Sequence, residues 1–331
     1  MKKNSCKKIL FITLSNIGDA VLTTPVLGLL VKELPNAEIT VMASNQSAEL
    51  FLGNPALREV IIWRKSRGLK EKINLVLELR RRKFDMVIDL KNTFLSPFLN
   101  AKYKTPLRRK IGERIYKKDV FLNLLKDVFE KSFKADLGIK DVPFYIWISD
   151  EDKQAAENLL KECFGSEQEK FITISPFAKS DTKTWPIDNF AKVIQRFNED
   201  TKYKIILVGA ESDREKCEEL ARSSAVELYN LCGKTNLKML AWILKKSSCL
   251  VSNDSAAMHI AAAMDVPVTA IFGPTDDKKY APPAKIHRII TAPLNCRPCE
   301  KAQCVFGKKP ADCLNNITVD EVVEKIEEIL R

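Results

Sequence analysis

The chain has 331 residues, of which 45% are hydrophobic and 29% are charged, proportions typical of a soluble globular protein with material for two domains. No apolar stretch reaches the length of a membrane-spanning helix, and the run Ile9–Leu14 is too short for a secretory signal. We therefore expect a cytoplasmic protein.

The net charge of +11 lies in the N-terminal half. Residues 1–150 contain 28 Lys and Arg against 16 Asp and Glu, whereas residues 151–331 contain 26 against 27. The excess gathers in basic clusters near Arg64, Arg80 and Arg108. A solvated helix face explains any one cluster. The asymmetry between the halves favours an anionic partner: a nucleic acid, a membrane surface or a phosphorylated substrate.

Strand and helix patterns alternate along the first half of the chain. The predicted strands are Lys8–Leu14, Glu38–Ala43, Glu59–Ile62, Met86–Leu90 and Phe144–Ile148. One helix is predicted from the loop Ser15–Asp19 to about Leu34, another from about Gly68 to Lys83, and further helical stretches between 91 and 142.

A second alternating series follows. Its predicted strands are Phe171–Ser175, Tyr203–Val208, Glu227–Tyr229, Cys249–Ser252 and Val268–Phe272. Its predicted helices are Asp150–Phe164, Ile187–Asn198, Asp213–Ser223, Leu237–Lys246, Ala256–Met264 and Thr318–Leu330, the last opened by a capping box of Thr318 and Glu321. Two such series predict two doubly wound, Rossmann-like α/β domains with a cleft between them.

Polar residues gather where the strand Cys249–Ser252 ends. Asp254 and Ser255 precede a helix of small residues that begins at Ala256. Ligands of open α/β sheets bind at this edge, and a helix start attracts anions. His259, one turn into the helix, is suited to contact a phosphate or another ligand oxygen. The alternative is an ordinary corner with Asp254 as N-cap and a packed histidine.

Three more segments carry candidate groups. Asp19 follows Gly18 after the first strand and is suited to act as a general base, or only to complement the helix dipole. Thr182, Lys183 and Thr184 lie in a polar loop that is suited to hold a diphosphate. Asp213, just past a strand end, is suited to bind ribose hydroxyls or to cap a helix.

Nine cysteines in a cytoplasmic chain indicate free thiols or metal ligands. Four of them cluster, and the first pair has metal-ligand spacing: Cys296, Cys299, Cys304 and Cys313. Four thiolates suffice for a tetrahedral structural metal. The later spacings are irregular, and the alternative is a loop with reduced thiols.

Several blocks, in the same order, resemble the ADP-heptose:lipopolysaccharide heptosyltransferases of glycosyltransferase family 9. They are Leu14-Ser15-x-Ile17-Gly18-Asp19, Lys183-x-Trp185-Pro186, Asn253-Asp254-Ser255 with Met258-His259, and Phe272-Gly273-Pro274-Thr275-Asp276. The resemblance implies a GT-B fold. Residues 1–150 would bind the acceptor and 151–316 the nucleotide sugar, and the terminal helix 317–331 would return to the N-terminal domain.

The resemblance also implies an inverting transferase that needs no metal or other cofactor and moves heptose from ADP-heptose to Kdo or heptose of the inner core. Asp19 would be the base. Lys183 with Thr182 or Thr184, and Ser255 with the backbone at Ala256, would stabilise the diphosphate; Asp213 would hold the ribose and His259 would lie near the phosphates or heptose. The acceptor would be an anionic lipid-linked oligosaccharide at the inner face of the cytoplasmic membrane, and no nucleic acid would bind.

One block departs from the family pattern. Members usually show Asn-Asp-Thr-Gly where this chain has Asn253-Asp254-Ser255-Ala256, which keeps the hydroxyl but adds a methyl group. A GT-B transferase that uses another nucleotide sugar is therefore an alternative. Others are a non-hydrolysing nucleotide-sugar epimerase and a nucleic-acid binder, although the basic clusters lack interleaved aromatic residues.

Overall fold

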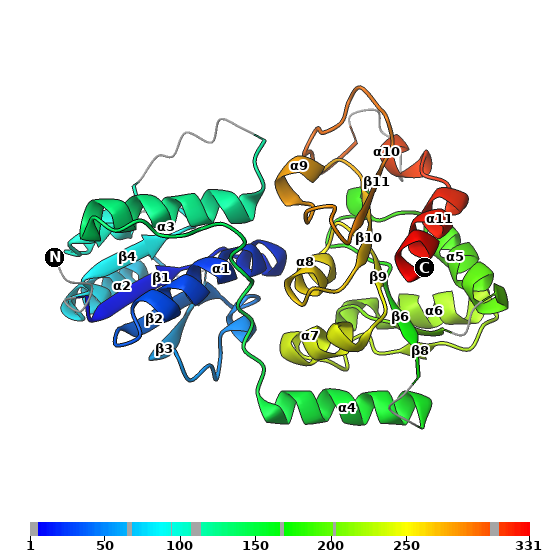
Figure 1. Ribbon diagram of the computed structural model, residues 1–331, viewed down its shortest axis with the longest axis horizontal. Coiled ribbons are helices and arrows are strands. Elements are labelled where there is room, and N and C mark those ends of the chain that lie inside the picture. Colours follow the sequence, from blue (N-terminus) through cyan, green and yellow to red (C-terminus); the bar gives the residue numbers. More distant parts are fainter. Residues whose placement is uncertain are drawn as a thin grey trace. The chain divides into compact units, whose positions relative to one another are not determined.

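The computed structural model describes residues 6–64, 68–93, 95–106, 114–165, 169–200, 203–304 and 311–331 (Figure 1). The chain forms two compact units, divided between Ser149 and Asp150. Each unit contains a parallel sheet with helices, so the predicted α/β class is confirmed. Among the described residues, no helix is long and apolar enough to cross a membrane.

The first unit contains a five-stranded parallel sheet in the order β3-β2-β1-β4-β5. Its strands are β1 (Lys8–Ile12), β2 (Glu38–Ser44), β3 (Glu59–Trp63), β4 (Met86–Asp89) and β5 (Tyr103–Lys104). Its helices are α1 (Ile17–Glu33), α2 (Leu69–Arg81) and α3 (Lys117–Phe133). The central strand β1 is buried from Ile9 to Ile12, because helices cover both faces of a parallel sheet.

The helices of the first unit cover opposite faces of this sheet. Leu75 and Leu79 of α2 pack in one cluster with Leu10 and Ile12 of β1. α1 and α3 pack against each other on the other side (Figure 1). Successive side chains of a strand point to opposite faces of the sheet. Each strand therefore contributes apolar side chains to the packing on both faces.

The predicted strand Phe144–Ile148 is wrong. This segment forms no strand and runs along α1 as an extended connector. The Tyr145 N–H donates to Thr24 Oγ1 at 3.2 Å. A Cβ atom on Gly28 would lie 2.9 Å from the Tyr145 Cβ atom, so the connector reaches α1 only because residue 28 is glycine. The edge place beside β4 is taken instead by the unpredicted strand β5.

The second unit contains a six-stranded parallel sheet in the order β11-β10-β9-β6-β7-β8. Its strands are β6 (Phe171–Ser175), β7 (Lys204–Leu207), β8 (Tyr229–Asn230), β9 (Leu250–Asn253), β10 (Val268–Phe272) and β11 (Arg288–Thr291). Its helices are α4 (Asp150–Phe164), α5 (Ile187–Asp200), α6 (Arg214–Ser224), α7 (Leu237–Lys246), α8 (Ala256–Ala263), α9 (Asp277–Tyr280), α10 (Asp312–Asn315) and α11 (Val319–Leu330).

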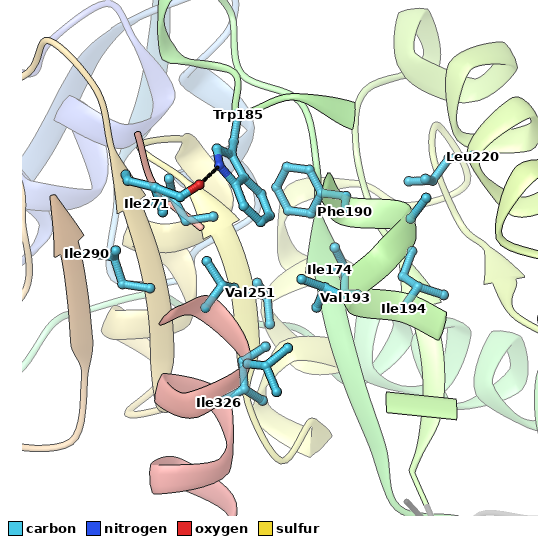
Figure 2. Packing of buried hydrophobic residues seen from close by; sticks show 14 of the residues in the cluster. Ile174, Trp185, Phe190, Val193, Ile194, Leu220, Val251, Ile271, Ile290 and Ile326 are labelled. Atoms are coloured by element: carbon cyan, nitrogen blue, oxygen red, sulfur yellow. Dashed lines mark hydrogen bonds between the residues drawn. The ribbon is translucent and has the colours of Figure 1, made fainter. Parts of the chain in front are cut away.

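Trp185 belongs to the main core of this unit, where its indole packs among the apolar side chains (Figure 2). Its side chain is fully buried and meets the Phe190 ring edge-on, with ring centroids 5.1 Å apart. The indole N–H donates to the Ile317 carbonyl at 3.1 Å. The polar tip of the tryptophan is therefore satisfied inside an apolar core.

The expectation that residues 317–331 return to the N-terminal domain is corrected. α11 packs on α5, β10 and β11 of the second unit. Its apolar side chains Val322, Val323 and Ile326 belong to the core around Trp185. The predicted capping box is formed: the Thr318 N–H donates to Glu321 Oε2 at 2.7 Å and the Glu321 N–H donates to Thr318 Oγ1 at 3.2 Å. Burial of the single apolar face in this core explains the position of the helix.

Replacement of Trp185 by alanine is expected to lower the free energy of unfolding of the second unit by about 3–5 kcal/mol, because it leaves a cavity and an unpaired carbonyl. Urea unfolding followed by circular dichroism measures the loss. Trp242→Ala, which truncates a half-buried tryptophan on α7, is the matched control and should cost clearly less. Equal losses in the two variants would show that the full burial of Trp185 adds nothing to the stability of the unit.

We expect His287 to make the second unit less stable in acid. The side chain is buried, and burial lowers its pKa to about 4 although the charge of Asp265 opposes the shift. Unfolded histidine titrates near ~6.5, so between about 4 and ~6.5 the unfolded chain binds more protons. The stability from the neutral imidazole is complete above ~6.5 and is lost as the pH falls towards 4, by up to about 3 kcal/mol.

His287→Gln is expected to remove this part of the pH dependence. The measurement is the free energy of unfolding of wild type and variant between pH 7 and pH 4. The difference between the two proteins isolates the histidine, since the carboxylates titrate in both. Parallel curves would show that His287 does not titrate with folding.

Candidate active site

Two polar segments leave the second sheet where its strand order reverses. The chain proceeds from β6 to β7 and β8 on one side, and from β9 to β10 and β11 on the other. Ligands of open α/β sheets bind at the carboxyl ends of strands at such a switch point. β6 leads into the loop 176–186 and β9 leads into Asp254 and α8, and these two strands are paired. The two segments predicted to bind the donor are therefore neighbours.

Asn253 joins these two segments. Its side chain is fully buried at the end of β9. The side-chain oxygen accepts the Trp185 N–H at 2.9 Å, and the side-chain amide donates to the Pro176 carbonyl at 2.8 Å. Asn253 is not among the site residues predicted from the sequence. The available signal was an amide at the end of an apolar strand, where a buried polar group needs partners.

Lys183 and Asp254 form an ion pair at the switch point. Lys183 Nζ lies 2.6 Å from Asp254 Oδ2. The Asp254 side chain is 6% exposed and the Lys183 side chain 36%, so the aspartate is covered while the lysine side chain remains partly exposed. Asp254 is not the N-cap of α8, because that position is held by Ser255. The alternative of Asp254 as a simple helix cap is therefore wrong.

The start of α8 lies next to this pair in the sequence. Ser255 makes no side-chain capping bond to the helix, and its hydroxyl lies 2.8 Å from the Ser252 hydroxyl. Ala256 is the first residue of the helix, and no acidic residue occupies its first turn. His259 is buried four residues after Ser255, on the same side of the helix. This helix end is thus suited to an anion.

The two threonines beside Lys183 take part in the loop itself. Thr182 Oγ1 lies 2.8 Å from Ser180 Oγ. Thr184 Oγ1 donates to the Ser180 carbonyl at 3.2 Å and accepts the Ala178 N–H at 3.3 Å. Thr184 therefore braces the loop that presents Lys183.

Asp213 follows β7, the neighbour of β6, at the same edge of the sheet. Its Oδ2 atom accepts the Ala210 N–H at 3.0 Å. A Cβ atom on Gly209 would lie 3.1 Å from both Asp213 Oδ2 and Cys232 Sγ, so a larger residue would crowd the carboxylate in this turn. Asp213, which is predicted to hold the ribose, thus accepts a hydrogen bond within its own turn through one of its two carboxylate oxygens.

The metal candidate is corrected. A hollow of about 230 Å³ is lined by all four clustered cysteines. However, within the described ranges no three His, Cys, Asp or Glu side chains are placed to hold a metal ion, and the cysteines are free. Burial raises the pKa of Cys313 to about 11. Arg297 instead ties this loop to β10 through the Gly273 carbonyl.

The first sheet has its own switch point, between β1 and β4. Asp19, after β1, is half-buried in the first turn of α1 and accepts a hydrogen bond from Asn16 Nδ2 at 3.0 Å. Asp89 ends β4 in register with Ile12 of β1. It is buried and accepts the N–H and hydroxyl of Thr93 at 2.8 and 2.7 Å. Asp89 is not among the residues predicted from the sequence, although an acid at the end of an apolar strand is a signal for such a site.

The structure describes Arg64 and Arg80 of the predicted basic clusters, but not Arg108. Arg64 is exposed just after β3, and Arg80 is exposed on α2. The cluster near Arg108 lies outside the described residues.

Residues 73–309 match the model of glycosyltransferase family 9 (heptosyltransferase). The chain belongs to this family. It is 31% identical to lipooligosaccharide heptosyltransferase 2 of Haemophilus influenzae over 97% of this chain and 99% of the relative. It is 25% identical to lipooligosaccharide heptosyltransferase 2 of Campylobacter jejuni over 95% and 96%. The family 9 chain is thus an enzyme, a glycosyltransferase, as predicted.

Solved structures share the fold of this family 9 enzyme. A glycosyl transferase family 9 protein from Veillonella parvula aligns with a TM-score of 0.82 at 23% identity, over 98% of this chain and 97% of that one. The ADP-heptose lps heptosyltransferase II of E. coli aligns with a TM-score of 0.76 at 23% identity, over 98% of each chain. The predicted GT-B fold is confirmed.

Lys183→Met is expected to destabilise the second unit by about 1–3 kcal/mol, because it leaves the buried Asp254 carboxylate without its cation. Adding Asp254→Asn to the Lys183→Met variant should recover part of that loss. Lys204→Met removes the cation of the exposed Lys204–Glu227 pair and should cost less than about 1 kcal/mol. Urea unfolding of wild type, Lys183→Met, Asp254→Asn and the double variant gives the coupling energy of the pair. A Lys183→Met loss no larger than that of Lys204→Met would contradict the pairing.

Proposed function

We propose that this glycosyltransferase moves heptose from ADP-heptose to the inner core of lipopolysaccharide, with inversion at the anomeric carbon. The observation that carries the proposal is the Lys183 ammonium group, held by Asp254 beside the start of α8 at the β6/β9 switch point. The family and the names of its relatives support heptosyl transfer and a lipopolysaccharide acceptor.

The second unit would bind the donor. As the bond between the anomeric carbon and the diphosphate breaks, negative charge grows on the leaving ADP. Lys183, the hydroxyls of Thr182 or Thr184, Ser255 and the backbone N–H groups from Ala256 onwards would stabilise this charge. The ammonium group and helix end supply the positive charge, so we expect no metal ion or other cofactor to be required, and a chelator should leave the rate unchanged. Asp213 would hold the ribose and His259 would lie near the phosphates or the heptose.

The first unit would bind and activate the acceptor. Asp19 would take the proton of an acceptor sugar hydroxyl, and the oxygen would attack the anomeric carbon from the face opposite the diphosphate. One carbon–oxygen bond forms, the bond to the diphosphate breaks, and ADP leaves with the electron pair. Attack from the opposite face inverts the anomeric centre.

The acceptor would be an anionic, lipid-linked oligosaccharide that ends in Kdo or heptose. The surplus of twelve positive charges in residues 1–150 matches its carboxylates and phosphates. The lipid would bring the enzyme into peripheral contact with the inner face of the cytoplasmic membrane.

Asp19→Asn is expected to lower acceptor-dependent ADP release from ADP-heptose by about 10²–10⁴-fold, because the amide cannot take the proton. The assay uses Kdo-lipid A and a heptose-truncated core as acceptors. Asp188→Asn changes an acid in the first turn of α5 and is the matched control, with the wild-type rate expected. ADP binding should be equal in all three proteins. A wild-type rate in Asp19→Asn would eliminate Asp19 as the base.

A transferase that uses another nucleotide sugar is the second candidate, favoured by the methyl group that Ala256 places at the start of α8. A panel of ADP, UDP and GDP sugars separates the two. Turnover of a UDP or GDP sugar, with no reaction of ADP-heptose, would contradict the proposed donor. Turnover without any acceptor would indicate an epimerase instead.

A further inference from the structure

We propose that the outward face of α2 is a docking surface for a bilayer that contains anionic lipid. The proposal rests on the proposed lipid-linked acceptor and names the part of the chain that holds the enzyme on the membrane. α2 (Leu69–Arg81) forms an outer layer of the first unit, with Leu75 and Leu79 packed on the sheet.

The opposite face of α2 exposes two large apolar side chains. Ile73 is 51% exposed and Leu77 is 47% exposed, whereas Leu75 and Leu79 are buried. Ile73 and Leu77 are four residues apart and therefore adjacent on the helix surface. The sheet-facing side chains already hold α2 in place, so these two do not contribute to the core.

Three cations share this face. At 3.6 residues per turn, Lys70 lies one turn before Ile73, and Arg80 and Arg81 lie one turn after Leu77. All three are exposed, and among the described residues no ion pair joins any of them. The two acids of the helix, Glu71 and Glu78, fall on its flanks, and Glu78 is paired with Arg82. The outward face therefore carries positive charge without a carboxylate.

A second apolar group lies on the same side of the sheet. Phe98, in the short 3-10 turn Ser96–Phe98, is 57% exposed. The flanking residues Leu95 and Leu99 belong to the cluster that also contains Leu75 and Leu79. The layer formed by α2 and this turn thus presents apolar side chains from two segments.

This combination fits a bilayer surface. With α2 parallel to the membrane, Ile73 and Leu77 reach the acyl boundary, and the long side chains of Lys70, Arg80 and Arg81 extend to the phosphates. An anionic leaflet attracts such cations, and the attraction grows with each one. A nucleic acid would match the charges but provides no apolar phase for Ile73 and Leu77.

The test is binding of the full chain to vesicles of phosphatidylethanolamine and phosphatidylglycerol, measured by flotation. Lys70→Gln with Arg80→Gln and Arg81→Gln should weaken partitioning on the order of 100-fold. Ile73→Ser with Leu77→Ser should weaken it about tenfold. Vesicles of phosphatidylcholine alone should bind wild type as weakly as the triple variant binds anionic vesicles.

Matched controls come from the second unit. Lys192→Gln with Arg222→Gln and Lys285→Gln removes three exposed cations, and Ile286→Ser removes a side chain that is 37% exposed. Both should bind anionic vesicles within about threefold of wild type. Circular dichroism melting of every variant verifies that the fold is retained.

Two results would overturn the proposal. Loss of binding in the triple variant alone would mean that Ile73 and Leu77 do not enter the bilayer. Undiminished binding by both α2 variants would exclude this face as the membrane-docking surface and would favour a protein partner for it. Vesicle binding needs no donor and no turnover, and transfer to a lipid-free core oligosaccharide should be equal in wild type and the variant with Ile73→Ser and Leu77→Ser. Failure of docking and failure of the transferase proposal are therefore distinguishable.

Discussion

The buried amide of Asn253 is the constraint on which the donor side of the second unit depends. A polar side chain with no exposure must find partners, and Asn253 finds them in the Trp185 N–H and the Pro176 carbonyl. These bonds hold both ends of the loop after β6 against the end of β9. Trp185 is thereby held in the core, and Lys183, two residues earlier, forms an ion pair with Asp254. One interaction between two strand ends thereby places the cation of the site.

The two units present different chemistry at equivalent places. In the first, the switch point between β1 and β4 carries two carboxylates, Asp19 and Asp89. In the second, the switch point carries the ammonium group of Lys183, paired with Asp254, and a helix end without an acidic first turn. Carboxylates accept protons, whereas an ammonium group and a helix start stabilise anions. The proposed division into acceptor activation and diphosphate stabilisation follows from this difference.

The positive charge of the first unit also has a spatial order. Three cations of α2 surround Ile73 and Leu77 on a face that no acid occupies. Charge alone would suit any polyanion, but exposed apolar side chains between the charges suit a surface with an apolar interior. The proposed lipid-linked acceptor and the proposed docking helix fit one requirement, because an enzyme that modifies a membrane-anchored acceptor must work where that acceptor lies.

Local patterns in the sequence determined much of this protein. Periodicity and capping residues predicted α4 and β6 with the observed bounds, and the polar motifs predicted that Lys183 and Asp254 follow strand ends. The tertiary structure alone decided which groups meet: the Lys183–Asp254 pair spans 71 residues, and Asn253 meets Pro176 across 77. The apolar segment Phe144–Ile148 looked like a strand but lies on α1, and the four cysteines form no metal site among the described residues. Periodicity reports which face of a segment is apolar, whereas the partner of that face depends on which sheet edges and surfaces remain uncovered once distant segments have packed.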